Sequence, residues 1–241
     1  MANILFIHGG AQGAWCWAQV SSALSLLGHE CYSIDLPGHG EDNTPLAHIT
    51  RQDYLDAVSN AIKALAWQEL TLIGHSNAGM LLGDLAKAHS QVTRLIYIAG
   101  FVLNQGESIM DIISPAHAQE YAQLASQSVD NALNIDHHYA HKYYFTDINE
   151  THAKLYFNKL TPEPFNPFLD PVQSTPAKLA IEKHYIICER DQRISLETAN
   201  LFAKKLKGSI DRLNVDHCAM LSNPSLLSEK LNAIITSQAN A

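Results

Sequence analysis

The sequence of 241 residues has few charged residues and no cluster of basic ones. Asp, Glu, Lys and Arg together make up 17% of the chain, against about 25% in an average globular protein. Acidic residues outnumber basic ones by 24 to 16, which gives a formal net charge of -8. Because binding to nucleic acids or to anionic membranes relies on a basic surface, we expect neither as a partner.

Cysteine is scarce as well, with four residues in the chain and no C-x-x-C pair. This excludes a disulfide-stabilised scaffold and favours reduced thiols, as in the cytoplasm. No apolar run approaches the roughly 20 residues that a membrane-spanning helix needs. The first residues lack the basic segment and the apolar stretch of a signal peptide. The sequence therefore predicts a cytoplasmic protein that does not cross a membrane.

The chain does contain enough apolar sequence for a sizeable core, with 46% hydrophobic residues. Short apolar runs alternate with longer segments that have helical spacing. The expected strands are residues 4–7, 31–34, 70–73, 95–99, 185–188 and 210–215. The expected helices are residues 14–27, 50–66, 77–89 and a C-terminal helix from Pro224. This alternation predicts an α/β fold, in which helices cover both faces of a parallel sheet.

Residues 106–178 interrupt the alternation. The segment has no convincing strand, is rich in Ala, His, Tyr and Phe, and is too long for a plain loop. We therefore expect a small helical cap at 106–178, inserted into an α/β core made of residues 1–105 and 179–241.

A candidate nucleophile follows the predicted strand 70–73. Residues 74–79 read G-H-S-N-A-G and precede a predicted helix, which is the context of a nucleophile elbow centred on Ser76. Such a turn needs small residues two positions before and after the nucleophile, and Gly74 and Ala78 are small. The motif alone is weak, because a serine that caps a helix after a strand gives the same pattern.

Three further features strengthen this interpretation. Asp191 and His217 each follow a predicted strand, and Ser76, Asp191 and His217 occur in the chain order of a Ser-Asp-His triad. Glu189 and Asp216 are the competing acids. A glycine pair follows the first strand, and its Gly10 is expected to supply a backbone N–H to an oxyanion, together with the N–H of Asn77.

These motifs resemble the methyl esterase and hydroxynitrile lyase branch of the α/β-hydrolases. The matching segments are residues 6–17 (FIHGGAQGAWCW), 35–40 (DLPGHG), 74–79 (GHSNAG), 185–194 (YIICERDQRI) and 216–221 (DHCAML). The chain departs from the family pattern at Gly10, Gln12 and Ala78. The resemblance implies the triad and the oxyanion donors named above, and a mainly parallel sheet of about six strands. It covers the cap poorly, so substrate choice is left open.

The sequence thus predicts a serine carboxylesterase for small to medium esters that uses no cofactor and no metal, as a monomer or homodimer. The alternatives are a hydroxynitrile-lyase-like enzyme that uses the same triad as a base, and a receptor-like member with slow turnover. The related plant lyases carry a Thr in place of Gly9 and a Lys in place of Cys218. His137 and His141 have the spacing of a helical metal site, but a polar cap helix is the preferred interpretation. Candidate pocket residues are Trp15, Trp17, Tyr143, Tyr144 and Phe145.

Overall fold

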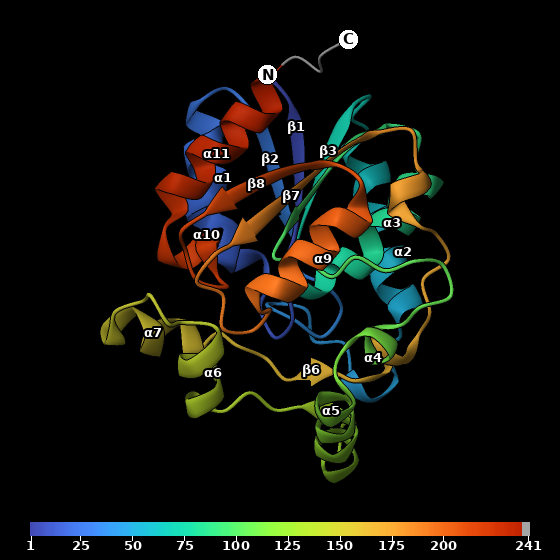
Figure 1. Ribbon diagram of the computed structural model, residues 1–241, viewed down its shortest axis with the longest axis vertical. Coiled ribbons are helices and arrows are strands. Elements are labelled where there is room, and N and C mark those ends of the chain that lie inside the picture. The colour runs from blue at the N-terminus through green and yellow to red at the C-terminus, as the bar shows by residue number, and fades with distance from the viewer. Residues whose placement is uncertain (238–241) are drawn as a thin grey trace.

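The computed structural model describes residues 1–237 and contains one central sheet of six parallel strands (Figure 1). The strands are β1 (Asn3–Ile7), β2 (Glu30–Ile34), β3 (Leu70–His75), β4 (Val92–Ile98), β7 (Glu182–Cys188) and β8 (Ser209–Leu213). Their order is β2-β1-β3-β4-β7-β8. The predicted fold class and all six predicted strands are confirmed, although β4 begins three residues earlier than expected and β8 ends two residues earlier.

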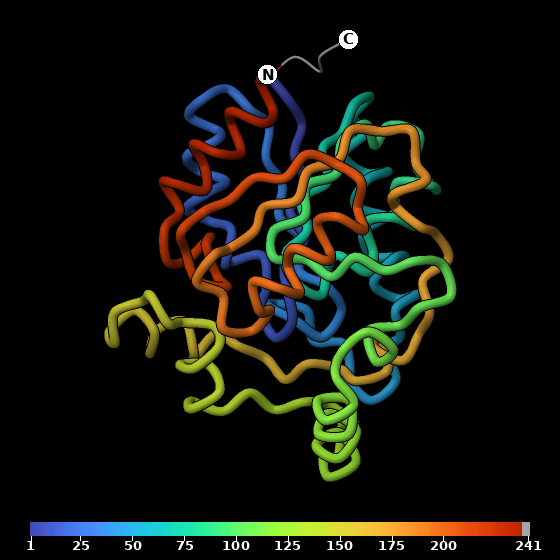
Figure 2. The backbone as a smooth tube through the Cα atoms, viewed as in Figure 1, coloured from blue at the N-terminus to red at the C-terminus, as the bar shows by residue number. Residues whose placement is uncertain are grey.

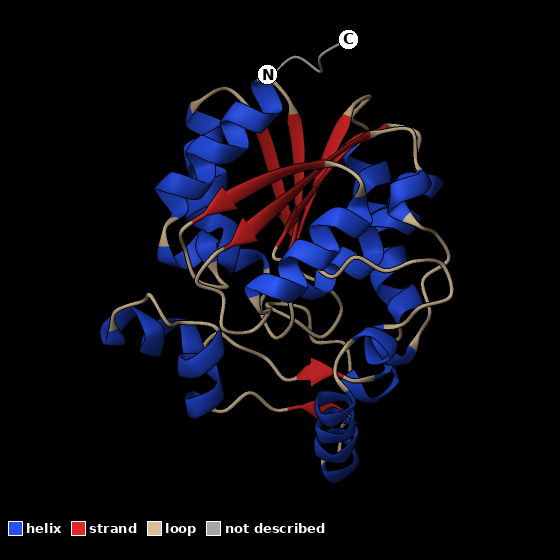
Figure 3. Cartoon of the chain, viewed as in Figure 1, coloured by secondary structure: helices blue, strands red, loops and turns tan. Residues whose placement is uncertain are grey.

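Helices cover both faces of the sheet, as predicted (Figure 3). In Figure 1, α1, α10 and α11 lie over one face and α2, α3 and α9 over the other. The α-helices of the core are α1 (Ala18–Leu26), α2 (Arg51–Leu65), α3 (Gly79–Ala88), α9 (Leu196–Leu206), α10 (Ala219–Ser222) and α11 (Pro224–Thr236). Short 3-10 turns are η1 (Ala14–Trp17), η2 (Leu46–His48), η3 (Ser76–Ala78) and η4 (Pro176–Lys178).

The two faces of the sheet bury two separate hydrophobic clusters, since side chains alternate along a strand. In β1, Leu5 and Ile7 belong to the cluster under α2, α3 and α9. Ile4 and Phe6 belong to the cluster under α1 and α11. A strand that is buried on both sides must be apolar at every position, which explains the continuous apolar runs in the sequence.

The segment between β4 and β7 carries a further set of elements beyond the carboxyl ends of the sheet strands (Figures 1 and 2). They are α4 (Ile109–Ile112), α5 (Pro115–Gln127), β5 (Ala132–Leu133), α6 (His137–Tyr143), α7 (Glu150–Phe157), β6 (Glu163–Pro164) and α8 (Asn166–Leu169). The expectation of no strand in this segment was wrong, because β5 and β6 form an antiparallel pair. Strands of two residues are too short for alternation to reveal them.

The inserted segment is joined to the sheet through the loop that follows β1. The Thr161 N–H donates to the carbonyl of Ala11 at 2.9 Å, and the Ala11 N–H donates to Oε2 of Glu163 at 2.6 Å. Glu163 is only 3% exposed. Burial raises the pKa of its carboxyl from 4.5 to about 8. The contact therefore holds a buried acid that is mostly protonated at neutral pH.

This buried acid makes stability depend on pH. Between about pH 4.5 and 8 the folded protein holds a proton on Glu163 that the unfolded chain has released, so this group lowers stability as pH rises. Glu163→Gln cannot ionise and keeps an acceptor for the Ala11 N–H. We expect the difference in unfolding free energy, variant minus wild type, to increase steadily from pH 5 to pH 8. Urea denaturation across this range measures this difference. If the unfolding free energies of the two proteins changed equally with pH, the raised pKa of Glu163 would be contradicted.

Candidate active site

The turn between β3 and α3 places Ser76 at the carboxyl edge of the sheet. Ser76 has a φ angle of 50°, in the left-handed region that costs energy for any residue with a side chain. The chain then enters η3 and α3 directly. The sharp turn thus holds the Ser76 hydroxyl at the end of a buried strand.

The loop after β8 brings His217 to this serine, and the loop after β7 brings Asp191 to His217. Nε2 of His217 lies 3.1 Å from Oγ of Ser76, and Nδ1 of His217 lies 2.7 Å from Oδ2 of Asp191. All three side chains are buried. The other carboxylate oxygen, Oδ1 of Asp191, accepts the N–H groups of Arg193 at 2.6 Å and Ile194 at 2.9 Å. The carboxylate is therefore fixed in orientation by its own loop.

The two competing acids lie elsewhere. Glu189 is exposed, and its carboxylate is 3.7 Å from Arg212. Asp216 is buried, but its Oδ2 accepts the Asp147 N–H at 3.0 Å. Neither carboxylate contacts the His217 ring, so the structure brings Asp191 to the histidine in preference to both.

The side chain of His75, next to Ser76 in the chain, points toward the loop that carries His217. Its Nε2 donates to the carbonyl of His217 at 2.9 Å, and the centres of the two rings are 4.7 Å apart. The loop after β8 crosses the end of β3, which brings the two residues together. Burial lowers the pKa of His75, which keeps this ring neutral. His75 therefore supports the backbone at His217.

The glycine loop after β1 lies directly against the Ser76 turn. A Cβ atom on Gly9 would lie 2.5 Å from Nδ1 of His75, and one on Gly10 would lie 2.5 Å from Nδ2 of Asn77. A side chain at either position would force its neighbour to move. Within residues 1–237 the Gly10 N–H has no acceptor, and Asn77 lies at the start of η3, where N–H groups have no partner inside the helix. Neither N–H group donates to a backbone carbonyl outside the helices and strands of residues 1–237.

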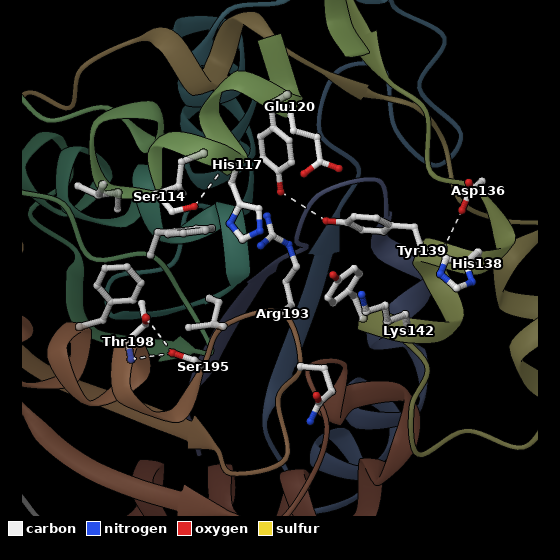
Figure 4. Close-up of a pocket in the computed structure, with 18 residues that line it drawn as sticks. Ser114, His117, Glu120, Asp136, His138, Tyr139, Lys142, Arg193, Ser195 and Thr198 are labelled. Atoms are coloured by element: carbon white, nitrogen blue, oxygen red, sulfur yellow. Dashed lines mark hydrogen bonds between the residues drawn. The ribbon is translucent and has the colours of Figure 1, made fainter. Parts of the chain in front are cut away.

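Two neighbouring cavities lie beside this site and share lining residues. The inner cavity, of about 40 Å³, is lined by Ser76, Asn77, Tyr144, Glu163 and eight further residues. The outer cavity, of about 590 Å³, is lined mainly by the inserted segment and the loop after β7 (Figure 4). The residues that line both cavities are Tyr121, Tyr139 and Arg193.

The aromatic residues proposed from the sequence divide between pocket and core. Tyr143 lines the outer cavity and Tyr144 the inner one. Trp17 is fully buried and stacks on Phe6, with ring centres 4.8 Å apart. Trp15 stacks on Tyr156 at 5.8 Å and Phe145 belongs to the core. Aromatic composition alone does not separate these roles, since both environments are apolar.

Sequence reasoning missed Glu163 and Arg193 as residues of the site. The sequence around Glu163 carries a signal, because Pro162 and Pro164 flank it and fix an extended backbone around one acid. Arg193 lies two residues after Asp191, in a loop that the sequence had already assigned to the site. Neither signal reveals where the side chain points, since the fold of the inserted segment decides that.

The histidine pair on α6 gives no sign of a metal site. His137 and His141 are exposed, and the His137 ring stacks on Phe157 with centres 3.5 Å apart. No group of three potential metal ligands occurs in the part of the chain that the structure describes. Within the same residues, no helix has the length and apolarity needed to cross a membrane.

Comparison with known proteins gives one family and a set of distant relatives. The model of the "Alpha/beta hydrolase family" matches residues 4–229. Methylesterase 2 of Arabidopsis thaliana is 23% identical over 96% of this chain and 95% of its own length. The carbendazim hydrolyzing esterase of a Nocardioides strain is 28% identical over 48% of this chain. The chain spans about half of that esterase and 63% of the putative chloroplastic methylesterase 11 of Arabidopsis thaliana.

Solved structures share the fold at low sequence identity. An extracellular alpha/beta-hydrolase from a Paenibacillus species is 20% identical with a TM-score of 0.89, over 96% of this chain and 98% of that one. The methylesterase MES16 from Arabidopsis is 20% identical with a TM-score of 0.81, over 98% and 99% of the two chains. The family match over residues 4–229 and the six parallel strands agree. The chain belongs to the alpha/beta hydrolase family, on the branch that includes the methylesterases.

Proposed function

We propose that the protein is a serine carboxylesterase in which Ser76 is the nucleophile, His217 the general base and Asp191 the acid. The observation that carries this proposal is the position of the His217 ring, within 3.1 Å of the serine hydroxyl and 2.7 Å of the aspartate. Relatives that are named methylesterases and esterases support the reaction class. Small-molecule esters are the substrates that this class takes.

The first half of the reaction forms an acyl-enzyme. Oγ of Ser76 attacks the ester carbonyl carbon while Nε2 of His217 takes the hydroxyl proton. The N–H groups of Gly10 and Asn77 stabilise the resulting oxyanion. The bond to the alcohol oxygen then breaks, and His217 gives its proton to the leaving alcohol. Asp191 holds the imidazole in the required tautomer and stabilises its protonated form.

The second half returns the enzyme to its starting state. A water molecule attacks the acyl-serine carbonyl while His217 takes one of its protons. The same two N–H groups stabilise the second oxyanion. The bond to Oγ of Ser76 then breaks, the serine regains a proton from His217, and the carboxylic acid leaves. Each step uses groups of this chain and one water molecule.

The charge on Glu163 affects how well an oxyanion is stabilised in this reaction. Oε2 of Glu163 lies 3.0 Å from the position of a Cβ on Gly10, beside the proposed oxyanion donors. A carboxylate there would oppose the negative charge that develops on the substrate oxygen. Because burial raises the pKa of Glu163 to about 8, the group is mostly neutral at pH 7. The protonated acid is the form that suits ester hydrolysis.

The lyase alternative is less favourable, because two side chains of the related lyases are missing. Gly9 has no hydroxyl to bind a cyanohydrin. Cys218 is buried, and burial raises the pKa of its thiol, so it carries no charge. A receptor-like role would instead require slow turnover and a long-lived acyl-enzyme.

We also propose the cytoplasm as the compartment of this protein. Cys16, Cys188 and Cys218 are free and buried, and burial raises the pKa of all three thiols. Free thiols are typical of a reducing compartment.

Substitution of the triad tests the assignment directly. Ser76→Ala and His217→Ala are expected to lower kcat for p-nitrophenyl acetate by up to ~10⁶-fold. Asp191→Asn should lower it on the order of 10⁴-fold, because the imidazole loses its orienting acceptor. Glu189→Gln is the matched control. A silent Asp191→Asn together with an inactive Glu189→Gln would identify Glu189 as the acid.

The ionisation of Glu163 predicts a decline in activity at alkaline pH. As pH rises through about 8, the group gains a negative charge beside the oxyanion donors, so kcat/KM of the wild type should fall. Glu163→Gln stays neutral and should keep its activity up to pH 9. Initial rates with p-nitrophenyl acetate between pH 6 and 9, corrected for spontaneous hydrolysis, give both profiles. The same decline in the variant would show that another group causes it.

A direct comparison of substrates separates esterase from lyase. We expect release of p-nitrophenol from p-nitrophenyl acetate and negligible cleavage of mandelonitrile or acetone cyanohydrin. The assays follow p-nitrophenol in one reaction and benzaldehyde or acetone in the other. Cyanohydrin cleavage well above background, with the ester untouched, would reverse the ranking. A single turnover that ends in a stable covalent adduct would favour the receptor-like role.

A further inference from the structure

The Arg193 side chain forms no ion pair within the part of the chain that the structure describes. The other four arginines each lie within 4.0 Å of a carboxylate oxygen; these are Arg51, Arg94, Arg190 and Arg212. Within residues 1–237, no carboxylate lies within that distance of the Arg193 guanidinium, and no hydrogen bond is formed by its side chain. This side chain is half-buried. A cation that is partly removed from water and has no ion-pair partner is costly, which points to a missing partner.

The Arg193 side chain extends into the outer cavity between His117 and Tyr139 (Figure 4). Its guanidinium carbon lies 5.5 Å from the centre of the Tyr121 ring. Stacking of this kind uses the face of the guanidinium and leaves the N–H groups at its edge free. Burial lowers the pKa of Arg193 only to about 10, so the side chain is a cation at neutral pH.

Within residues 1–237, no acid forms an ion pair with this guanidinium, although the charge of Glu120 is close enough to raise the pKa of Arg193 against the lowering effect of burial. Glu120 and Asp136 line the outer cavity, but both are exposed to solvent. Asp136 accepts the N–H of Tyr139 at the start of α6. Glu163 is the acid of the inner cavity, and its Oε2 is already bound by the Ala11 N–H. Arg193 is the only Lys, Arg or His side chain among the residues that line the inner cavity.

The position of Arg193 fits a role in substrate choice. It lines both the inner cavity, which contains Ser76, and the outer cavity. With about 40 Å³, the inner cavity has room for little more than the reacting group. The rest of an ester must therefore extend past Tyr121, Tyr139 and Arg193 toward the outer cavity. A substrate that reaches Ser76 passes the free guanidinium.

We propose that Arg193 binds a carboxylate carried by the substrate, so that the preferred substrates are carboxylic esters with a second, free acid group. The planar guanidinium can hold both oxygens of a carboxylate. This inference rests on the proposed esterase function and deepens it, because it names the substrate class. The acid group lies on the acyl half or on the alcohol half of the ester, and the test distinguishes the two.

Two pairs of esters, each matched in shape, provide the test. Monomethyl glutarate and methyl 5-methylhexanoate differ in a carboxylate on the acyl half. The second pair, 4-acetoxybenzoate and 4-isopropylphenyl acetate, differs in a carboxylate on the alcohol half. For wild type we expect kcat/KM for the acidic ester to exceed that for the neutral ester by about tenfold or more in one pair. The size of this preference follows from the strength of hydrogen bonds to charged groups. The pair that shows the preference identifies the half.

Substitutions then assign the preference to the guanidinium. Arg193→Met should lower the ratio of acidic to neutral kcat/KM by about 10- to 100-fold, mainly through KM. Arg193→Lys keeps the charge without the planar fork and should retain part of the ratio. Lys142→Met is the matched control, because Lys142 lines only the outer cavity and its ammonium lies over the Tyr143 ring. Its ratio should stay within about threefold of wild type.

Inhibition of the wild type gives a second measurement that needs no variant. Glutarate should inhibit p-nitrophenyl acetate hydrolysis at least tenfold more strongly than glutaramide. Hydrolysis of neutral and acidic esters at equal rates, with the same ratio in Arg193→Met and no preferential inhibition by glutarate, overturns this proposal alone. Failure of the wild type to hydrolyse any of these esters or p-nitrophenyl acetate overturns the proposed function and this proposal with it.

Discussion

The site depends on the contact of one imidazole with residues from two distant loops. His217 follows β8 and contacts Ser76 after β3 and Asp191 after β7. Three segments that are far apart in the sequence meet because all six strands are parallel, so their carboxyl ends lie at one edge of the sheet. Without this geometry each residue would be an ordinary loop side chain.

The loops at this edge are held together by close contacts between glycine backbone and side chains and by hydrogen bonds to the backbone. The Gly9 and Gly10 loop packs directly on His75 and Asn77, and the His75 ring binds the carbonyl of His217. Asp191 is fixed by two N–H groups of its own loop. These contacts fix the reacting groups before a substrate arrives, which is the condition for electrostatic stabilisation of an oxyanion.

The inserted segment between β4 and β7 lines both cavities beside the candidate site. Thr161 and Glu163 attach it to the loop after β1, and its tyrosines form the walls of both cavities. The segment also places the ring of Tyr121 with its centre 5.5 Å from the guanidinium carbon of Arg193. The triad residues lie on loops of the core, and the inserted segment supplies most of the residues that line the outer cavity.

The sequence by itself determined the α/β class, the six strands, and Ser76 and His217 as residues that meet in the site, with Asp191 as the preferred acid among three. Strands buried on both faces must be apolar throughout, and the turn at Ser76 needs small neighbours, so both features are local and visible in the chain. The tertiary structure alone decided between Asp191, Glu189 and Asp216, the direction of His75, and the environments of Glu163 and Arg193. These depend on side-chain directions and on packing between distant segments, which no local pattern encodes.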